Sequence, residues 1–248
     1  MRGEAVSKSA VRLGMVALSA AIVVGVGSPV ALAATPAASP VSLSTVQAKA
    51  AAAITLRVDD LNAAISKANS TRQLGSSTPT LVSYLQEDIA PLQALKAKIA
   101  GDTGVAAARD DAVTIFTNYR VLALVLPAAH LAATSDGIVV TVIPNLTSLS
   151  AKAASYVNAS NQAVLQPLID DMNAQIGAAA TAATGVAATV LAYTPTQWNS
   201  NHDLLAPARG SVQASVKDVA TARDDANKIR NVLTTAKAPS TTTPTTAS

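Results

Sequence analysis

Acidic residues that stand in adjacent pairs are the first candidates for chemistry in this sequence. Neighbouring carboxylates on a helix point about 100° apart, so one pair is poorly placed to hold a single ion. Pairs from different helices would have to converge, as in bundle metal sites, which recruit glutamate and a Glu-x-x-His partner. Glu87 is the only glutamate beyond residue 33, with no histidine near it in the sequence. We therefore expect solvated polar faces with short-range ion pairs, and no metal site. The pairs are Asp59-Asp60, Glu87-Asp88, Asp110-Asp111, Asp170-Asp171 and Asp224-Asp225.

The remaining residue types narrow the chemistry further. The histidines, His130 and His202, are far apart in the sequence, and neither stands beside a Gly-x-Ser-x-Gly elbow or a phosphate-binding glycine loop. The chain has no cysteine, which excludes disulfides, thiolate metal sites and a cysteine nucleophile. We predict a protein that is not an enzyme, with no catalytic residues and no cofactor.

A second group of residues suggests contact with a partner. Arg120 stands just before an apolar run, residues 121–126, and Asp136 is the only formal charge between Arg120 and Lys152. A charge beside apolar surface is either paired internally or exposed at an interface, and pairing is favoured because an unpaired buried charge is costly. The functional alternative is an interaction patch formed by Tyr119, Arg120, Pro127 and Asp136.

Composition limits the partners. The chain has 248 residues, of which 50% are hydrophobic and only 2% aromatic, and 54 are alanine. Few aromatic residues argue against a β-rich fold and against stacking on nucleic acid bases. The whole chain carries 18 basic and 15 acidic residues; removing residues 1–33, with three basic and one acidic, leaves 15 minus 14, a net charge of +1. This charge provides no footprint for nucleic acid.

Both ends of the chain differ from its middle. Residues 1–33 resemble a signal peptide, with basic residues at the start, an apolar run over 13–26 and the small-residue motif Ala31-Leu32-Ala33. We expect cleavage near Ala33, and a secreted protein that is extracellular or associated with the cell wall. Residues 34–43 would form a flexible mature N-terminus and 44–237 a helical domain. Residues 238–248, rich in Thr, Ser and Pro, would be a disordered tail.

Apolar residues at helical spacing recur along the predicted domain. Ile54, Val58, Leu61, Ile65 and Ala68 form one stripe, which Ser44 or Thr45 would cap. A second helix would carry Leu85, Leu92 and Ile99, with a kink at Pro91, and a short third would follow Gly104. Further helices would run from Pro127 to about Tyr156, from about 161 to 191, and along the stripe 212–233, after a loop at 193–201. Residues 121–126 are either extended or helical.

These stripes predict an all-α fold, an elongated antiparallel bundle of about five helices with coiled-coil-like packing. Four short motifs recur in the same order, which indicates either an internal duplication or chance matches between alanine-rich helices. In the first of these motifs, Val58–Ile65 matches Ile169–Ile176. Thr78–Thr80 matches Thr194–Thr196, Ile89–Pro91 matches Leu205–Pro207, and Ala108–Ala112 matches Ala222–Ala226.

Residues 109–121, followed by the segment ending at Pro127 and by Asp136, resemble a pattern in secreted, alanine-rich helical proteins of actinobacteria, a family of unknown function. The loop Thr194–Asn201 is part of the resemblance, which implies export and a helical fold but no established activity. We expect an exported, non-enzymatic structural or interaction module, whose partner is a protein or a component of the cell envelope. The alternative is a membrane-active or lipid-binding protein that uses the uncharged segment 172–192.

Overall fold

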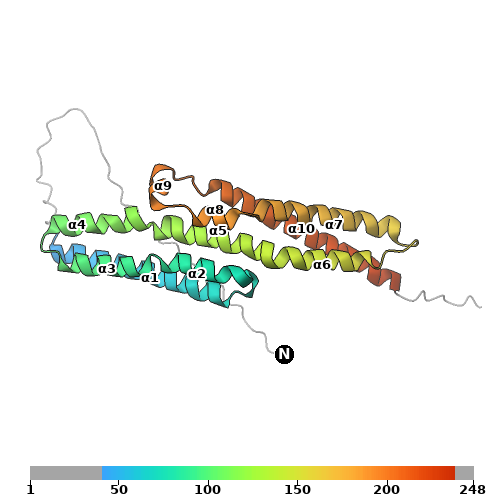
Figure 1. Ribbon diagram of the computed structural model, residues 1–248, viewed down its shortest axis with the longest axis horizontal. Helices are drawn as coiled ribbons and strands as arrows, with labels where there is room; N and C mark the ends of the chain where they lie inside the picture. Colours follow the sequence, from blue (N-terminus) through green and yellow to red (C-terminus); the bar gives the residue numbers. More distant parts are fainter. Residues whose placement is uncertain (1–40, 238–248) are drawn as a thin grey trace, which may run out of the picture. The chain divides into compact units, whose positions relative to one another are not determined.

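α-Helices and short 3-10 or π-helical turns make up most of residues 41–237, the part of the chain that the computed structural model describes (Figure 1). No β-strand occurs within this range, which confirms the predicted all-α fold. The predicted signal peptide (1–33), most of the predicted flexible segment (34–43) and the predicted tail (238–248) lie outside the described residues.

The first helix, α1 (Leu43–Ser70), buries the predicted stripe. Ile54 and Leu61 are fully buried, and Val58 and Ile65 pack partly buried against the same core. The helix begins earlier than expected, because Ser42 is its N-cap and the Ser42 Oγ accepts a hydrogen bond from the Thr45 N–H at 3.2 Å. Ser44 and Thr45 are therefore residues of the first turn, not caps.

Pro91 divides the second predicted helix into two. After the 3-10 turn η1 (Arg72–Ser77), α2 (Thr78–Gln86) and α3 (Ile89–Gly101) are separated by a turn at Glu87-Asp88. A proline has no N–H to donate, and its ring clashes with the carbonyl four residues earlier, which here belongs to Glu87. The helix is thus broken one turn before Pro91, where we expected a kink at Pro91 itself.

A glutamine ties α3 to α1. The Gln47 Nε2 donates hydrogen bonds to the carbonyls of Ile99 and Asp102, both at 3.0 Å, at the C-terminal end of α3. Further along, the Lys96 ammonium donates to the Thr55 Oγ1 at 2.8 Å. Early residues of α1 thus meet late residues of α3, so the two helices are antiparallel.

A helical run from Val105 to Ala154 follows, interrupted by three π-helical turns. Its elements are α4 (Val105–Thr114), η2 (Ile115–Tyr119), η3 (Val121–Val125), α5 (Leu126–Gly137), η4 (Ile138–Val142) and α6 (Ile143–Ala154). Residues 121–125 are therefore helical, which decides between the two interpretations of the sequence. Pro127 and Pro144 each lie in the first turn of a helix, where the missing N–H costs no hydrogen bond.

The last four helices are α7 (Gln162–Ala183), α8 (Val186–Leu191), α9 (Pro195–Ser200) and α10 (Ala206–Lys237). The single helix expected over 161–191 is interrupted at Gly185, whose φ of 79° is left-handed and favours glycine. The expected loop 193–201 contains α9. The Ser215 Oγ of α10 donates to the Ala179 carbonyl of α7 at 2.9 Å, while Met172 lies near Ile229, so α7 and α10 are antiparallel.

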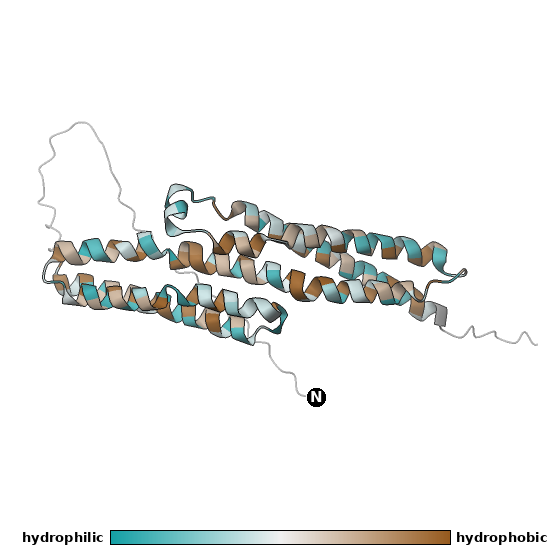
Figure 2. Cartoon of the chain, in the orientation of Figure 1, coloured by the Kyte–Doolittle hydropathy of each residue, from teal (hydrophilic) through white to brown (hydrophobic). Residues whose placement is uncertain are grey.

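Buried apolar residues form two clusters. The first joins α1–α5 to α8, α9 and the start of α10, and the second joins η4, α6, α7 and the rest of α10. Figure 2 shows apolar residues concentrated along the run from η3 to η4 and in α8. Because α1 and α10 are about 42 and 48 Å long at 1.5 Å per residue, small side chains accumulate burial over many turns. These features confirm the predicted antiparallel helical bundle.

Three of the four recurring motif pairs occupy corresponding places: Val58–Ile65 and Ile169–Ile176 lie within the long helices α1 and α7, and Ile89–Pro91 and Leu205–Pro207 lie at the starts of α3 and α10. Ala108–Ala112 lies in the ten-residue helix α4, just after the turn that ends α3, whereas Ala222–Ala226 lies inside the 32-residue helix α10. Thr78-Pro79 and Thr194-Pro195 both begin short helices. One pair of motifs therefore differs in the length of its helix, and the internal duplication stays a prediction.

Candidate interaction site

Arg120 has a backbone conformation that separates it from its neighbours. Its φ of 48° and ψ of 30° are left-handed, and among residues 41–237 it is the only residue other than glycine with a positive φ. It joins the two π-helical turns η2 and η3. The Arg120 Nε donates a hydrogen bond of 2.6 Å to the Asn199 Oδ1, and the Asn199 Nδ2 donates one of 2.9 Å to the Thr117 carbonyl. One asparagine therefore contacts both η2 and the residue at the bend.

Helix α9 places that asparagine. Thr194 and Gln197 form a capping box, in which the Thr194 Oγ1 accepts from the Gln197 N–H and the Gln197 Oε1 accepts from the Thr194 N–H. Trp198 is only 8% exposed and packs into the first apolar cluster. The ring of His202 meets the Trp198 ring edge-on, with centroids 5.8 Å apart. α9 is thus fixed at both its start and its centre.

The segment 116–122 exposes apolar side chains on both sides of Arg120. Phe116 is 50% exposed and Leu122 46% exposed, while Tyr119 is partly buried. The Arg57 guanidinium lies over the Phe116 ring, 4.6 Å from its centroid. Burial lowers the pKa of Arg57, and the nearby Asp60 carboxylate opposes this effect by raising it. One face of the Phe116 ring therefore packs against Arg57, while the rest of the side chain is open to solvent.

The four residues of the predicted patch do not lie together. Tyr119 and Arg120 belong to the 116–122 segment, and Pro127 opens α5. Asp136 lies nine residues beyond Pro127 on the same helix, about 14 Å along its axis. Between residues 41 and 237 the ion pairs are Lys98–Asp111 and Lys228–Asp225, so neither Arg120 nor Asp136 belongs to one. Internal pairing of Arg120 was expected with a carboxylate, but the partner that the structure shows is the side-chain amide of Asn199.

Asp88 lies close to two tyrosines at the junction of α2 and α3. Burial, reinforced by the charge of Glu87, raises the pKa of Asp88 to about 6. Burial likewise raises the pKa of Tyr84, with the Asp88 and Glu87 charges adding to it, and the buried Tyr84 hydroxyl has no hydrogen-bond partner among the described residues. The pKa of Tyr119 is raised by burial and by Asp88. The Asp88 charge therefore acts on tyrosines of both α2 and η2.

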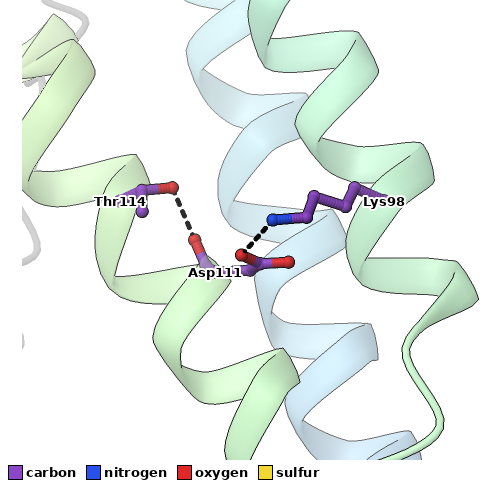
Figure 3. A network of polar contacts seen from close by, with 3 residues as sticks. All are labelled: Lys98, Asp111 and Thr114. Carbon is purple, nitrogen blue, oxygen red and sulfur yellow. Dashed lines mark hydrogen bonds and ion pairs between the residues drawn. The ribbon is translucent and has the colours of Figure 1, made fainter.

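The acidic pairs divide between surface and core. Lys98 donates to the Asp111 Oδ1 at 2.7 Å, and Figure 3 shows the Thr114 hydroxyl bonded to the Asp111 carbonyl. Asp225 departs from the expectation of a solvated face, because its side chain is 0% exposed and its Oδ1 accepts from the Lys228 ammonium at 2.7 Å. Its Oδ2 has no partner within 41–237. No three potential metal ligands come together in this part of the chain.

A groove that the sequence did not predict lies between α1, η1, α2, α5, η4 and α10. We call it the α5 groove; its volume is about 540 Å³ and most of its lining is aliphatic. Leu74 and Leu85 belong to the first apolar cluster, and Val219 to the second. His130 is exposed at the rim of this groove, far from the ring of His202 in sequence. Because six elements contribute, no local pattern in the sequence marks it.

The segment 172–192 packs into the bundle along one face. Met172, Ile176, Ala179, Ala183, Val186 and Val190 are buried, at intervals of three or four residues. Two helical runs within 41–237, Val105–Ala154 and Gln162–Leu191, are long and apolar enough to cross a membrane. The outward face of the second run is mostly Ala, Gly and Thr, which drive membrane insertion weakly.

In comparisons with known proteins, no protein-family model, no curated protein and no solved structure matches the chain.

Proposed function

We propose that the protein is exported and, without being an enzyme, binds a protein of the cell envelope through the segment 116–122. The features of residues 1–33 support export, as does the resemblance to secreted actinobacterial proteins. The composition of the exposed segment supports binding. Arginine and aromatic residues dominate the energy of protein interfaces, and here Phe116, Tyr119 and Arg120 stand together with Leu122.

The observation that carries this proposal is the left-handed Arg120 between two π-helical turns. A non-glycine residue in this conformation costs of the order of 1 kcal/mol, and such strain persists where surrounding contacts over-determine it. π-Helical turns are rare and occur frequently at functional sites. A straight α-helix would have needed neither the left-handed residue nor the π-helical turns. The chain instead fixes the bend with Asn199 of α9.

Fixing the bend in advance favours binding. A preorganised surface loses less conformational freedom when it meets its partner, so more of the contact energy appears as affinity. The alternative, membrane activity through residues 172–192, has less support because the larger side chains of that segment pack against the bundle.

A cell-binding measurement tests the proposal. The fluorescently labelled protein, purified after expression of the full chain, is added to cells of the native host that lack the gene, and the bound fraction is measured against concentration. We expect saturable binding that Leu122→Asp weakens at least tenfold, because a charge would be buried at the interface.

The matched control is Val164→Asp on α7, since Val164 is also exposed, at 54%, and lies outside the segment. We expect this variant to bind like the unchanged protein, with the same circular dichroism spectrum. Equal binding by the two aspartate variants, or no saturable binding by the unchanged protein, would show that the segment is not the binding surface.

A further inference from the structure

The α5 groove is bordered by both apolar clusters. Leu74, Leu81 and Leu85 form one wall, from η1 and α2, and Ile138 and Val219 form another, from η4 and α10. A volume of about 540 Å³ lies within the range of small-molecule sites, roughly 300–1,000 Å³. The groove therefore offers an aliphatic surface of a size that suits a small molecule.

Contacts at one end hold the groove in shape. The Thr141 Oγ1 of η4 donates a hydrogen bond of 2.8 Å to the Gln73 carbonyl of η1. Gly75 has a φ of 50°, and a Cβ at that position would lie 3.1 Å from the Val140 Cγ1. Glycine thus permits both the turn and the close approach of η4. The π-helical turn and η1 are consequently fixed against each other at the end of the groove.

The charged side chains at the rim of the groove are all basic. Lys67 of α1, Arg223 of α10 and His130 of α5 line the groove and are exposed, and no carboxylate is among its lining residues. Asp224 follows Arg223, but on a helix it points about 100° away. Thr71 and Thr134 also line the groove, and their hydroxyls donate to carbonyls of their own helical segments. An anionic group at the rim would therefore meet cations from α1 and α10 and an imidazole N–H from α5.

The apolar lining of the groove indicates what kind of group would accompany an anionic group at the rim. No phenylalanine, tyrosine or tryptophan lines the groove, so a nucleobase or another flat ring would find no large stacking surface within its walls. Leucine, isoleucine, valine and alanine side chains complement an aliphatic chain. We propose that the α5 groove binds a free medium-chain fatty acid, with the chain along the apolar walls and the carboxylate between Lys67, His130 and Arg223.

A second groove between α6, α7 and α10 provides an internal comparison. It carries Lys152 and Arg230, but asparagines and Tyr156 make up much of its rim. It also reaches Thr234, close to the end of the described residues. Its basic residues therefore serve as controls for a general effect of positive charge.

Calorimetric titration with laurate below its micellar concentration tests the proposal, using the protein purified after expression of the full chain. Dodecyltrimethylammonium, which has a chain of the same length and the opposite charge, is the matched ligand. We expect one laurate per protein, and binding of the ammonium at least tenfold weaker. Because this comparison uses the unchanged protein, it does not depend on how any variant folds.

Variants then locate the site. We expect the double variant Lys67→Gln with Arg223→Gln to bind laurate at least tenfold more weakly. The double variant Lys152→Gln with Arg230→Gln should keep its affinity for laurate within twofold. Ala220→Trp places a large side chain in the groove and should block laurate, while Ala174→Trp, on the exposed face of α7, should not.

Several results would overturn the proposal. They are an absence of laurate binding, equal binding of laurate and dodecyltrimethylammonium, and equal effects of the two double variants. Vesicles of anionic phosphatidylglycerol distinguish a free fatty acid from a membrane surface. Sedimentation of the protein with these vesicles, together with no binding of laurate monomers, would mean that the basic residues contact a membrane instead.

Discussion

Replacing Asp88 by asparagine should make the protein more stable at neutral pH and leave it unchanged in acid. The pKa of this carboxyl is 3.8 without perturbation and about 6 in the fold, where burial and the charge of Glu87 disfavour its ionised form. The folded state therefore holds the proton more tightly than the unfolded state. The protonated Asp88 carboxyl therefore stabilises the fold fully below pH 3.8, and this stabilisation is lost as the pH rises to about 6.

The size of the effect follows from the pKa difference. At about 1.4 kcal/mol per pKa unit the full difference would correspond to about 3 kcal/mol. Because the carboxyl is only partly buried, solvent screens the interaction, and we expect a gain of about 1 kcal/mol for Asp88→Asn near neutral pH. For a domain of this size that gain is an increase in Tm of about 2–4 °C. Asparagine has nearly the same shape, and the Asp88 side chain makes no capping hydrogen bond to α3.

Urea unfolding followed by circular dichroism, at about pH 4 and about pH 7.5, measures the gain. Asp59→Asn, which removes an exposed carboxylate on α1, reports the effect of deleting a surface charge. The reasoning is refuted if the difference between Asp88→Asn and the unchanged protein is the same at both pH values, or if the variant is less stable near neutral pH.

Two other substitutions test contacts of the described residues. Asn199→Ala should lower the free energy of unfolding by about 1 kcal/mol, because two hydrogen bonds at the Arg120 bend are lost. Amide hydrogen exchange at residues 121–125 should also become faster. Unchanged exchange at these residues would contradict the role of Asn199 at the bend. Lys228→Met should lower the midpoint of urea unfolding, because the buried Asp225 carboxylate loses the partner of its Oδ1. Adding Asp225→Asn should restore much of that loss, and a double variant no more stable than Lys228→Met would argue against the pairing.

Helical periodicity made the fold class predictable from the sequence, because it depends on spacing within each segment. The stripe containing Ile54 and Leu61 is buried as its spacing indicates. Helix ends were less predictable. Gly185 interrupts a segment that would otherwise continue as a helix, and the break caused by Pro91 falls at the residue whose carbonyl its ring would strike.

The site was only partly predictable, because its partners come from distant parts of the chain. The sequence marked Tyr119 and Arg120 as unusual, but Asn199 lies 79 residues from Arg120. The pattern Thr194-Pro195-x-Gln197 is a capping-box signal that would have indicated α9. Asp225 stands three residues after Ala222 and four before Ile229, so its spacing placed it on the buried face of α10, although its residue type indicated solvent.

The central claim is that the protein binds its partner through the segment 116–122, and photo-crosslinking in living host cells tests it most directly. A photoreactive amino acid replaces Leu122 in one strain and Val164 in another; both side chains are exposed. We predict a discrete crosslinked product from position 122 that is absent from position 164. The same products from both positions, or none from position 122, would contradict the claim.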